Sequence, residues 1–362
     1  MTGMRDLLVD VAAEARPYDV TDQALRTARR QRRIAWLAPV AAVVLATAGV
    51  AAVLPHSRPA NSTVVSWLPE KLDVAESTSA LPDSRLGLAV LAYTRADGST
   101  VLVADDGGHY DAGEGVRAIS PDGRWVALVR DGRVVLRDLG GDRVVDLGSD
   151  DDTNVAAWSS DGRWLAVRSG VTNHGAPQSV MVIELATGRQ AAKVAAGDYG
   201  TTVVCGLRDS AFLLLCSDFD NIDEVSLSRV NPLTGDDLGR QTVDLNKGVT
   251  KSFFVGGELM PDGHTLAFRT EGLEHAAGDL LTFDLSRPNL RPRHHNLPVP
   301  TRDERALRQV QSSVDGGVIV TRRYGQDLRI AAVELLDFAG DRVETITTVR
   351  GDIRDIVVRG QV

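Results

Sequence analysis

The sequence VRAISPDGRWVALVRDGRVVLRDLGGDRVVDLG, residues 116–148, is the stretch that decides the fold. Its opening phrase returns as VAAWSSDGRWLAVRSG from residue 155 and, more faintly, as MPDGHTLAF at 260–268 and SVDGGVIV at 313–320. Self-similarity at intervals of this size is typical of folds that repeat one supersecondary unit. The sequence therefore predicts a repeat architecture.

Each copy contains an Asp-Gly pair that predicts a tight turn between two strands. In Ser120-Pro121-Asp122-Gly123, proline suits the second position of a type I turn and glycine the fourth. A further copy at Asp209 keeps the spacing without the glycine, so each interval between turns fits one four-stranded sheet. The predicted turn residues are Asp122, Gly123, Asp161, Gly162, Asp262, Gly263, Asp315 and Gly316.

A small residue follows each turn at the same distance. These residues are Ala127, Ala166, Ala267 and Val320. Apolar residues two positions away give the period of a buried β-strand. Because inner strands crowd near the axis of a ring, we expect these small residues on inner strands.

The two ends of the repeat region complete each other. Residues 351–362, GDIRDIVVRGQV, look like the opening strand of a copy, whereas residues 86–113 look like its later strands. Pairing the ends closes a ring and removes exposed strand edges. We predict an all-β, six-bladed β-propeller over residues 85–362, with five or seven blades as alternatives.

The S-x-D-G-R-W-[VL]-A phrases at 120–127 and 159–166 resemble the WD40-like repeats of TolB-type propellers. The resemblance covers residues 85–362 and implies the fold. It specifies no activity, because such propellers host binding, scaffolding and catalysis alike.

Residues 34–54, IAWLAPVAAVVLATAGVAAVL, form an uncharged run of 21 residues. As a helix this run is about 31 Å long, which matches a hydrocarbon core of about 30 Å. We predict one transmembrane helix, rather than a cleaved signal peptide or a buried core helix, because the run exceeds a signal h-region and has no polar face. A cluster of basic residues precedes it: Arg26, Arg29, Arg30, Arg32 and Arg33. The positive-inside rule places the N-terminus in the cytoplasm and the rest of the chain outside the cell membrane.

Residues 1–33 predict a short cytoplasmic stub. Apolar residues within 4–15 recur with helical spacing, so an amphipathic helix there either docks a cytoplasmic partner or lies on the inner leaflet. The ARPYDVTD-x-ALR-x-ARR pattern of residues 15–30 and the topology resemble actinobacterial single-pass proteins, including some membrane anti-sigma regulators. The zinc anti-sigma motif is absent, since residues 1–33 contain no Cys or His.

Residues 55–84, rich in Pro, Ser, Thr and Asp, predict a stalk or an arm laid on the ring.

Charge and cysteine content limit the partners. The formal charge of −9 and a sequence pI near 5.3 provide no field that attracts nucleic acid.

The chain has two cysteines, Cys205 and Cys216, which flank a turn at nearly equal distances. We expect a cross-strand disulfide in an oxidising compartment, with two buried thiols as the alternative.

No residue pattern predicts a catalytic, cofactor or metal site. Asp150, Asp152 and Asn154 imitate the start of a calcium loop, but Val155 replaces the expected glycine and Asp161 the final glutamate. Asp218 and Asp220 suggest an acidic loop, and the neighbouring His294 and His295 point oppositely on an extended chain. Trp125 and Trp164 follow the turns and suit core packing. The motifs of common hydrolases and nucleotide enzymes are absent.

Three functions are compatible with these sequence features. The first is a noncatalytic module that binds an extracytoplasmic protein or envelope ligand. The second is a transmembrane regulator that couples an outer sensor to a cytoplasmic partner such as a sigma factor. The third is an extracytoplasmic propeller hydrolase with acids in its channel.

Overall fold

The computed structural model describes residues 65–151, 153–169, 179–195, 202–208, 211–218, 224–244, 252–272, 279–287, 290–295, 306–325 and 327–360. All of them belong to one compact unit, Asn61–Val362. The predicted stub at 1–33 and the predicted span at 34–54 lie outside the described residues. No helix with the length and apolar character needed to cross a membrane occurs in the part of the chain that the structure describes.

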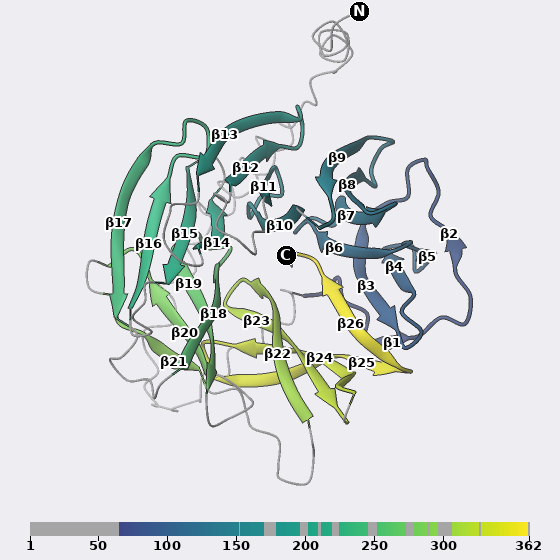
Figure 1. Cartoon of the computed structure of the whole chain (residues 1–362). Helices are drawn as coiled ribbons and strands as arrows, with labels where there is room; N and C mark the ends of the chain where they lie inside the picture. Colours follow the sequence, from purple (N-terminus) through teal and green to yellow (C-terminus); the bar gives the residue numbers. More distant parts are fainter. Residues whose placement is uncertain are drawn as a thin grey trace, which may run out of the picture. The chain divides into compact units, whose positions relative to one another are not determined.

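The described strands form six sheets around a common axis, which confirms the six-bladed propeller (Figure 1). Blade I contains β2 (Ser79–Ala80), β3 (Ala89–Arg95), β4 (Thr100–Ala104), β5 (His109–Asp111) and β26 (Ile353–Val358). Blade II contains β6 (Gly115–Ile119), β7 (Trp125–Arg130), β8 (Arg133–Asp138) and β9 (Val144–Ser149). Blade III contains β10 (Thr153–Trp158), β11 (Trp164–Ser169), β12 (Ser179–Glu184) and β13 (Arg189–Ala195).

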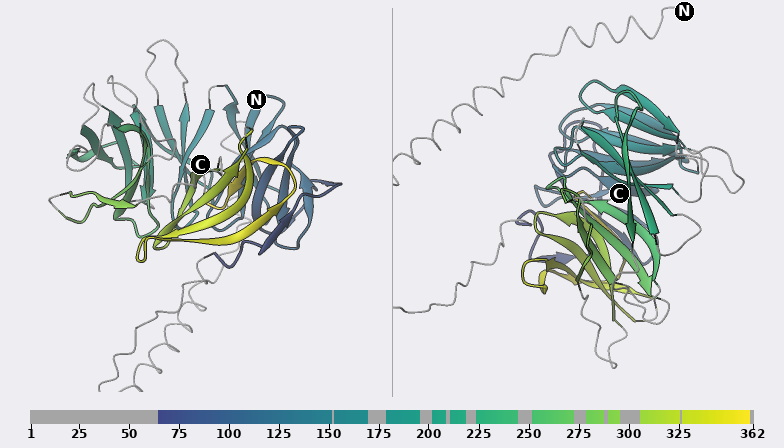
Figure 2. Two further views of the ribbon diagram at one scale, coloured as in Figure 1. Left: turned by 90° about the horizontal axis from the view of Figure 1, so that it is seen from below. Right: turned by 90° about the vertical axis from the view of Figure 1, so that its left-hand side faces the viewer.

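The other three blades are built in the same way, and in blade VI β1 is the outermost strand. Blade IV contains β14 (Thr202–Arg208), β15 (Phe212–Asp218), β16 (Glu224–Val230) and β17 (Asp237–Asp244). Blade V contains β18 (Ser252–Leu259), β19 (Thr265–Gly272), β20 (Asp279–Asp284) and β21 (Arg293–His295). Blade VI contains β1 (Lys71–Asp73), β22 (Ala306–Val314), β23 (Gly317–Tyr324), β24 (Arg329–Asp337) and β25 (Arg342–Arg350). Figure 2 shows successive blades standing side by side around the axis.

The innermost strands are β6, β10, β14, β18, β22 and β26. Five of them, β6, β10, β14, β18 and β22, precede an Asp-Gly turn or its counterpart. The small residues after the turns lie on the strands second from the axis, with Ala127, Ala166 and Ala267 at 0%, 0% and 3% exposure. The second strand is packed between two neighbouring blades, and this packing favours a small residue there.

Every innermost strand contains a β-bulge near its middle. The register shifts fall at Val116/Ala118, Val155/Ala157, Val204/Gly206, Phe254/Gly256, Val310/Ser312 and Ile353/Asp355. A bulge leaves one residue unpaired, increases the twist of the strand and re-aims a side chain. The β-bulges of all six innermost strands therefore shape the wall around the axis.

The ring closes by pairing the two ends of the repeat region, as predicted. Strand β26, near the C-terminus, pairs antiparallel with β3, with Ile356 opposite Tyr93 and Val358 opposite Leu91. The chain then crosses to blade II, where the Gly360 amide donates to the Ile119 carbonyl at 2.8 Å. Blade I is thus assembled from both ends of the chain.

We call the β26–β3 pairing, where the two ends of the ring meet, the seam. Residues 65–84 pack against the two blades next to it, and we call them the arm. Strand β1 pairs parallel with β25 of blade VI, and β2 pairs parallel with β5 of blade I. The arm buries Leu72 and Val65 in the core that blades VI and I share. Its backbone accepts hydrogen bonds from the ring, including Arg95 Nη2 to the Ala75 carbonyl at 2.7 Å and Thr347 Oγ1 to the Pro69 carbonyl at 2.7 Å.

Two equivalent turn glycines test the closure. Gly123 and Gly316 both have φ of 77°, but a Cβ on Gly123 would collide with the Ala89 carbonyl oxygen, whereas one on Gly316 would meet nothing within 4 Å. Gly316→Ala should lower the free energy of unfolding by about 1 kcal/mol, the cost of the left-handed backbone. Gly123→Ala should cost about 1–3 kcal/mol more because the closure must shift. Urea unfolding measures both, and equal costs would contradict this account of the seam.

A second pair of variants tests the arm. Leu72 is 2% exposed and its neighbour Lys71 is exposed on the same strand. Leu72→Ala should lower the free energy of unfolding by roughly 2–5 kcal/mol through lost burial and a cavity. Lys71→Ala is the matched control and should change it little. If Leu72→Ala is equally mild, the arm adds no stability to the ring.

Candidate functional site

The predicted turns of blades II and III have the same hydrogen-bond pattern. In blade II the Gly123 amide donates to the Ser120 carbonyl at 2.8 Å, and Ser120 Oγ donates to Asp122 Oδ1 at 2.6 Å. The Trp125 amide then donates to Ser120 Oγ at 2.8 Å. The turn of blade III repeats these bonds with Ser159, Asp161, Gly162 and Trp164. The aspartate fixes the turn, and Trp125 and Trp164 are both 5% exposed, in accord with their predicted core role.

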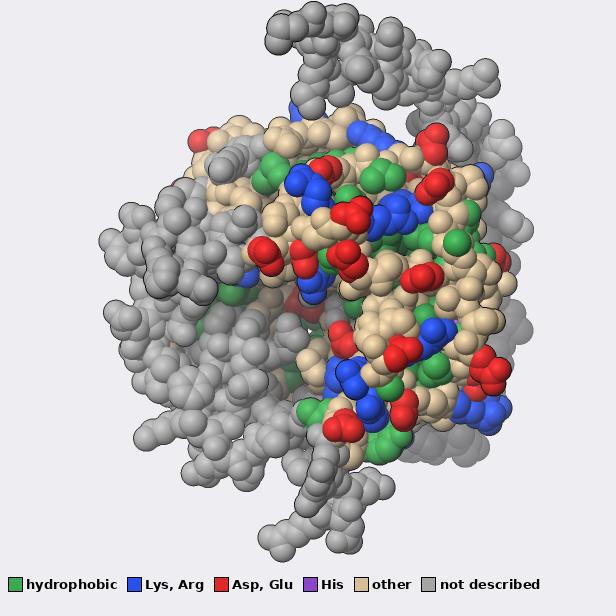
Figure 3. Space-filling view, turned by 45° about the vertical axis from the view of Figure 1, so that its right-hand side comes forward, with side chains coloured by type: hydrophobic (Ala, Val, Ile, Leu, Met, Phe, Trp, Pro, Cys, Tyr) green, Lys and Arg blue, Asp and Glu red, His purple; other side chains and the backbone are tan. Residues whose placement is uncertain are grey.

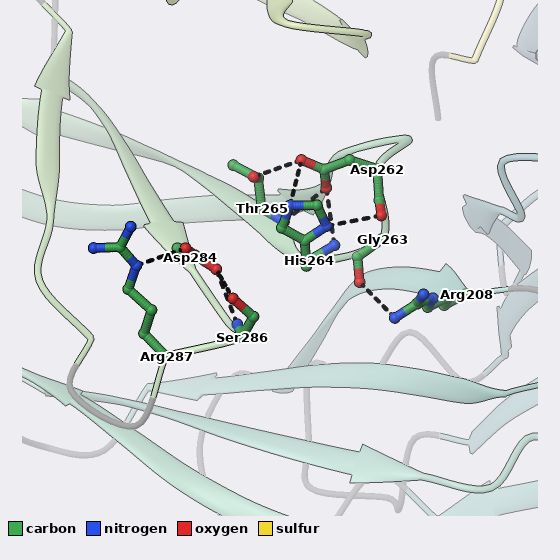
Figure 4. Close-up of polar contacts among 8 residues, drawn as sticks. All are labelled: Arg208, Asp262, Gly263, His264, Thr265, Asp284, Ser286 and Arg287. Atoms are coloured by element: carbon green, nitrogen blue, oxygen red, sulfur yellow. Dashed lines mark hydrogen bonds and ion pairs between the residues drawn. The ribbon is translucent and has the colours of Figure 1, made fainter.

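The turn of blade V uses its aspartate differently (Figure 4). Asp262 accepts from the amides of His264 and Thr265, each at 2.8 Å, and from Thr265 Oγ1 at 2.6 Å. Burial raises the pKa of Asp262, but these hydrogen bonds outweigh it and hold the pKa below the ordinary value. Arg208, from blade IV, donates to the Gly263 carbonyl at 3.3 Å, so the turn is also a junction between blades.

These turns form the rim of a cavity at the centre of the ring. The cavity encloses about 470 Å³, and all six blades contribute to it. The rim residues, one from each blade, are Pro121, Ser160, Arg208, Gly263, Asp315 and Gly360. Three bulge residues, Ala156, Cys205 and Gln311, line its wall. A cavity of this size falls within the roughly 300–1,000 Å³ of ligand pockets.

The arm reaches this cavity through Trp67. The Arg359 guanidinium lies over the Trp67 ring, 5.3 Å from its centroid, and both residues line the cavity. Arg359 Nε also donates to the Ala89 carbonyl at 2.5 Å. Burial lowers the pKa of Arg359, which nearby Asp105 and Asp122 partly offset, and the group remains charged because guanidinium is so basic. Seam, arm and cavity therefore meet at one arginine.

The two cysteines form a disulfide between β14 and β15. This is the predicted cross-strand disulfide, but the two cysteines are not directly opposite: Cys216 pairs with Val203, and Cys205 is the unpaired bulge residue. Both cysteines are buried, at 1% and 0% exposure, and their Cα atoms are 5.8 Å apart. The bridge fixes the wall of the cavity at Cys205.

A buried histidine joins blades V and VI, and no sequence signal marked it. His295 Nδ1 lies 2.7 Å from Asp341 Oδ1, and its Nε2 lies 2.9 Å from Thr282 Oγ1. This order of hydroxyl, imidazole and carboxylate matches a nucleophile with its base and orienting group. Thr282 and His295 are 8% and 1% exposed, however, so the group holds two blades together and offers no access to a substrate.

Within the described residues, the acidic candidates do not assemble into a site. Asp150 forms an ion pair with Arg117, with Oδ2 at 2.6 Å from Nη2. Asp152, Asp209 and Asp220 lie outside the described residues. Among those described, no three His, Cys, Asp or Glu side chains gather as metal ligands. On the face in Figure 3, acidic and basic side chains lie interspersed.

Comparisons with known proteins give fold-level likeness only. No protein family and no curated protein matches the chain. Among solved structures it is similar to a TolB-type protein from Agrobacterium tumefaciens at 15% identity and a TM-score of 0.45, over 76% of this chain and 91% of that one. It is also similar to an oligogalacturonate lyase from Vibrio parahaemolyticus, at 11% identity and a TM-score of 0.43, over 74% and 80% of the two chains. Identity at this level carries no information on shared activity.

The His295 contact makes stability depend on pH. Burial lowers the pKa of His295 below its ordinary value, although Asp341 opposes this. The folded protein therefore holds the neutral ring, which donates from Nδ1 to Asp341 and accepts from Thr282, while the unfolded chain takes up the proton. The free energy of unfolding should fall as the pH is lowered from about 7.5 to about 5.5, through the ordinary histidine range.

One substitution isolates this effect in urea unfolding at both pH values. His295→Gln should flatten the pH dependence. An unaltered slope in His295→Gln would assign the pH dependence to other groups.

Proposed function

We propose that this chain is a membrane-tethered, extracytoplasmic binding module without catalytic activity. In this proposal residues 34–54 cross the membrane, residues 1–33 remain in the cytoplasm, and the propeller presents its cavity to a protein or envelope ligand. The observation that carries the proposal is the cavity itself, to which all six blades contribute a residue. A rigid ring of this kind places residues from distant parts of the sequence on one concave surface.

A regulatory role is a second candidate, and the arm favours it. Trp67 lines the cavity and belongs to the arm, which begins shortly after the predicted span. A ligand that moves Trp67 would change the segment leading to the membrane and then to residues 4–15. Deletion of residues 1–16 should then alter the binding of a cytoplasmic partner such as a sigma factor, and unchanged binding would remove this candidate.

A hydrolase is the third candidate, since two carboxylates, Glu258 and Asp315, line the same cavity. Glu258→Gln and Asp315→Asn should abolish glycan or lactone hydrolysis if these groups act as acid and base. Hydrolysis that survives both substitutions would exclude this pair as the catalytic groups.

A blocked cavity tests the binding module. Ala156 is an unpaired bulge residue that lines the cavity, so Ala156→Trp should fill the space with little change in strand pairing. Val144 is 54% exposed on β9, and Val144→Trp is the matched surface control. The immobilised fragment 61–362, which contains every described strand, should retain an envelope component that Ala156→Trp loses and Val144→Trp keeps. Equal retention by all three proteins would show that the cavity is not the binding surface.

A further inference from the structure

Three arginines line the cavity, and no described carboxylate forms a direct ion pair with them, although Asp105 and Asp122 lie near enough to Arg359 to act on its charge. Arg168, Arg208 and Arg359 come from blades III, IV and I, and all three line the same space. Within the described part of the chain, none of the three forms an ion pair. Arg208 and Arg359 each donate one hydrogen bond, to backbone carbonyls, and Arg168 donates none among these residues.

Several arginines outside the cavity pair with acids. On blade II, Arg117, Arg124 and Arg133 each lie within 2.7 Å of an aspartate oxygen. The whole chain carries a net charge of −9, so acidic partners are abundant. Guanidinium groups without an ion-pair partner, on the wall and the exposed rim of a cavity, give it a positive potential that attracts anions from solution.

Two carboxylates also line the cavity, and they set the balance of charge. Asp315 lies at the rim in the connection between β22 and β23, where it is exposed. Glu258 is half-buried and already has an interaction of its own. Three guanidinium groups against two carboxylates leave the lining with one excess positive charge.

The rest of the wall is apolar and partly aromatic. Trp67 and Trp158 line the cavity together with Leu259, Met260 and Val314. An inorganic ion would leave these apolar surfaces in contact with water, whereas a ligand with an apolar body would bury them, which is favourable. Guanidinium groups bind carboxylate and phosphate through paired N–H donors, which gives the polar end of such a ligand its partner.

We propose that the cavity binds an organic anion, a carboxylate or phosphate attached to an apolar body, held by Arg168 and Arg208 and bounded by Trp67. This inference rests on the proposed binding function and adds the chemical class of the ligand. Arg359 contributes charge from the seam, where it is already held by Trp67 and the Ala89 carbonyl.

The test uses fragment 61–362 and three probes of one shape: 2-naphthoate, 2-naphthalenemethanol and 2-naphthylmethylamine. Calorimetric titration should rank their affinities in that order. Arg168→Gln and Arg208→Gln should each weaken 2-naphthoate by about tenfold, the effect of losing a hydrogen bond to a charged group. Arg342→Gln removes the same charge from the exposed outer strand β25 and should have no effect.

Arg208 also bridges blades IV and V, so its variant needs a second form. Arg208→Lys keeps the charge and should retain most of the affinity, and thermal melting checks that each variant folds. Equal affinity for 2-naphthoate and the amine, or affinity unaffected by Arg168→Gln and Arg208→Gln, would overturn the anion assignment.

The two proposals fail separately. If Ala156→Trp abolishes retention of an envelope component while the arginine variants bind 2-naphthoate normally, the module stands and the ligand class is wrong. If Ala156→Trp changes neither retention nor 2-naphthoate binding, the cavity itself is not a binding site and both proposals fall.

Discussion

The pairing of β26 with β3 is the constraint on which the rest of the structure depends. A blade in this fold is stable only with a neighbour on each side, because its second strand is apolar on both faces and must be covered twice. A linear row of six blades would leave two such faces and two strand edges open. In blade I the innermost strand, β26, comes from the C-terminus, so the ring closes and neither the faces nor the strand edges stay open. Opening the ring then requires breaking a strand ladder as well as a packed interface.

The arm reinforces the same seam from outside. Its two short strands add to blade VI and blade I, the blades on either side of the point where the chain ends meet. Arg137 extends the contact, donating from a fully buried guanidinium to the carbonyls of Pro82 and Ser84. Elsewhere, arginines join neighbouring blades through backbone carbonyls: Arg143 reaches Leu185, Arg229 reaches Leu285 and Arg293 reaches Phe338. Side-chain bonds to carbonyls thus hold blades together where no strand ladder runs between them.

The predictable part of the structure is the part that local chemistry dictates. Asp122 and Gly123 specify a turn within four residues, and the repetition of that turn predicts a ring of about six blades. The matching ends of the repeat region predict its closure. The bulges are different, because nothing in the sequence around Cys205 distinguishes a bulge from regular pairing. The Cys205–Cys216 disulfide is predicted correctly, but the register of the strands that carry it is not. His295 and Asp341 are 46 residues apart and meet only after two blades have packed. Trp67 and Arg359 lie at opposite ends of the ring sequence, so neither neighbourhood alone reveals their contact.

The meeting of seam and cavity at Arg359 has an energetic consequence. One side chain donates to the Ala89 carbonyl of blade I, stacks on Trp67 of the arm and lines the central space. In the proposed binding mode, an anion in that space would act on the charge of Arg359. If the anion binds only the closed ring, linkage requires that it stabilise the closure by the same free energy that the closure contributes to its binding. Occupancy of the cavity would then be coupled to the pairing of β26 with β3 and, through Trp67, to the arm.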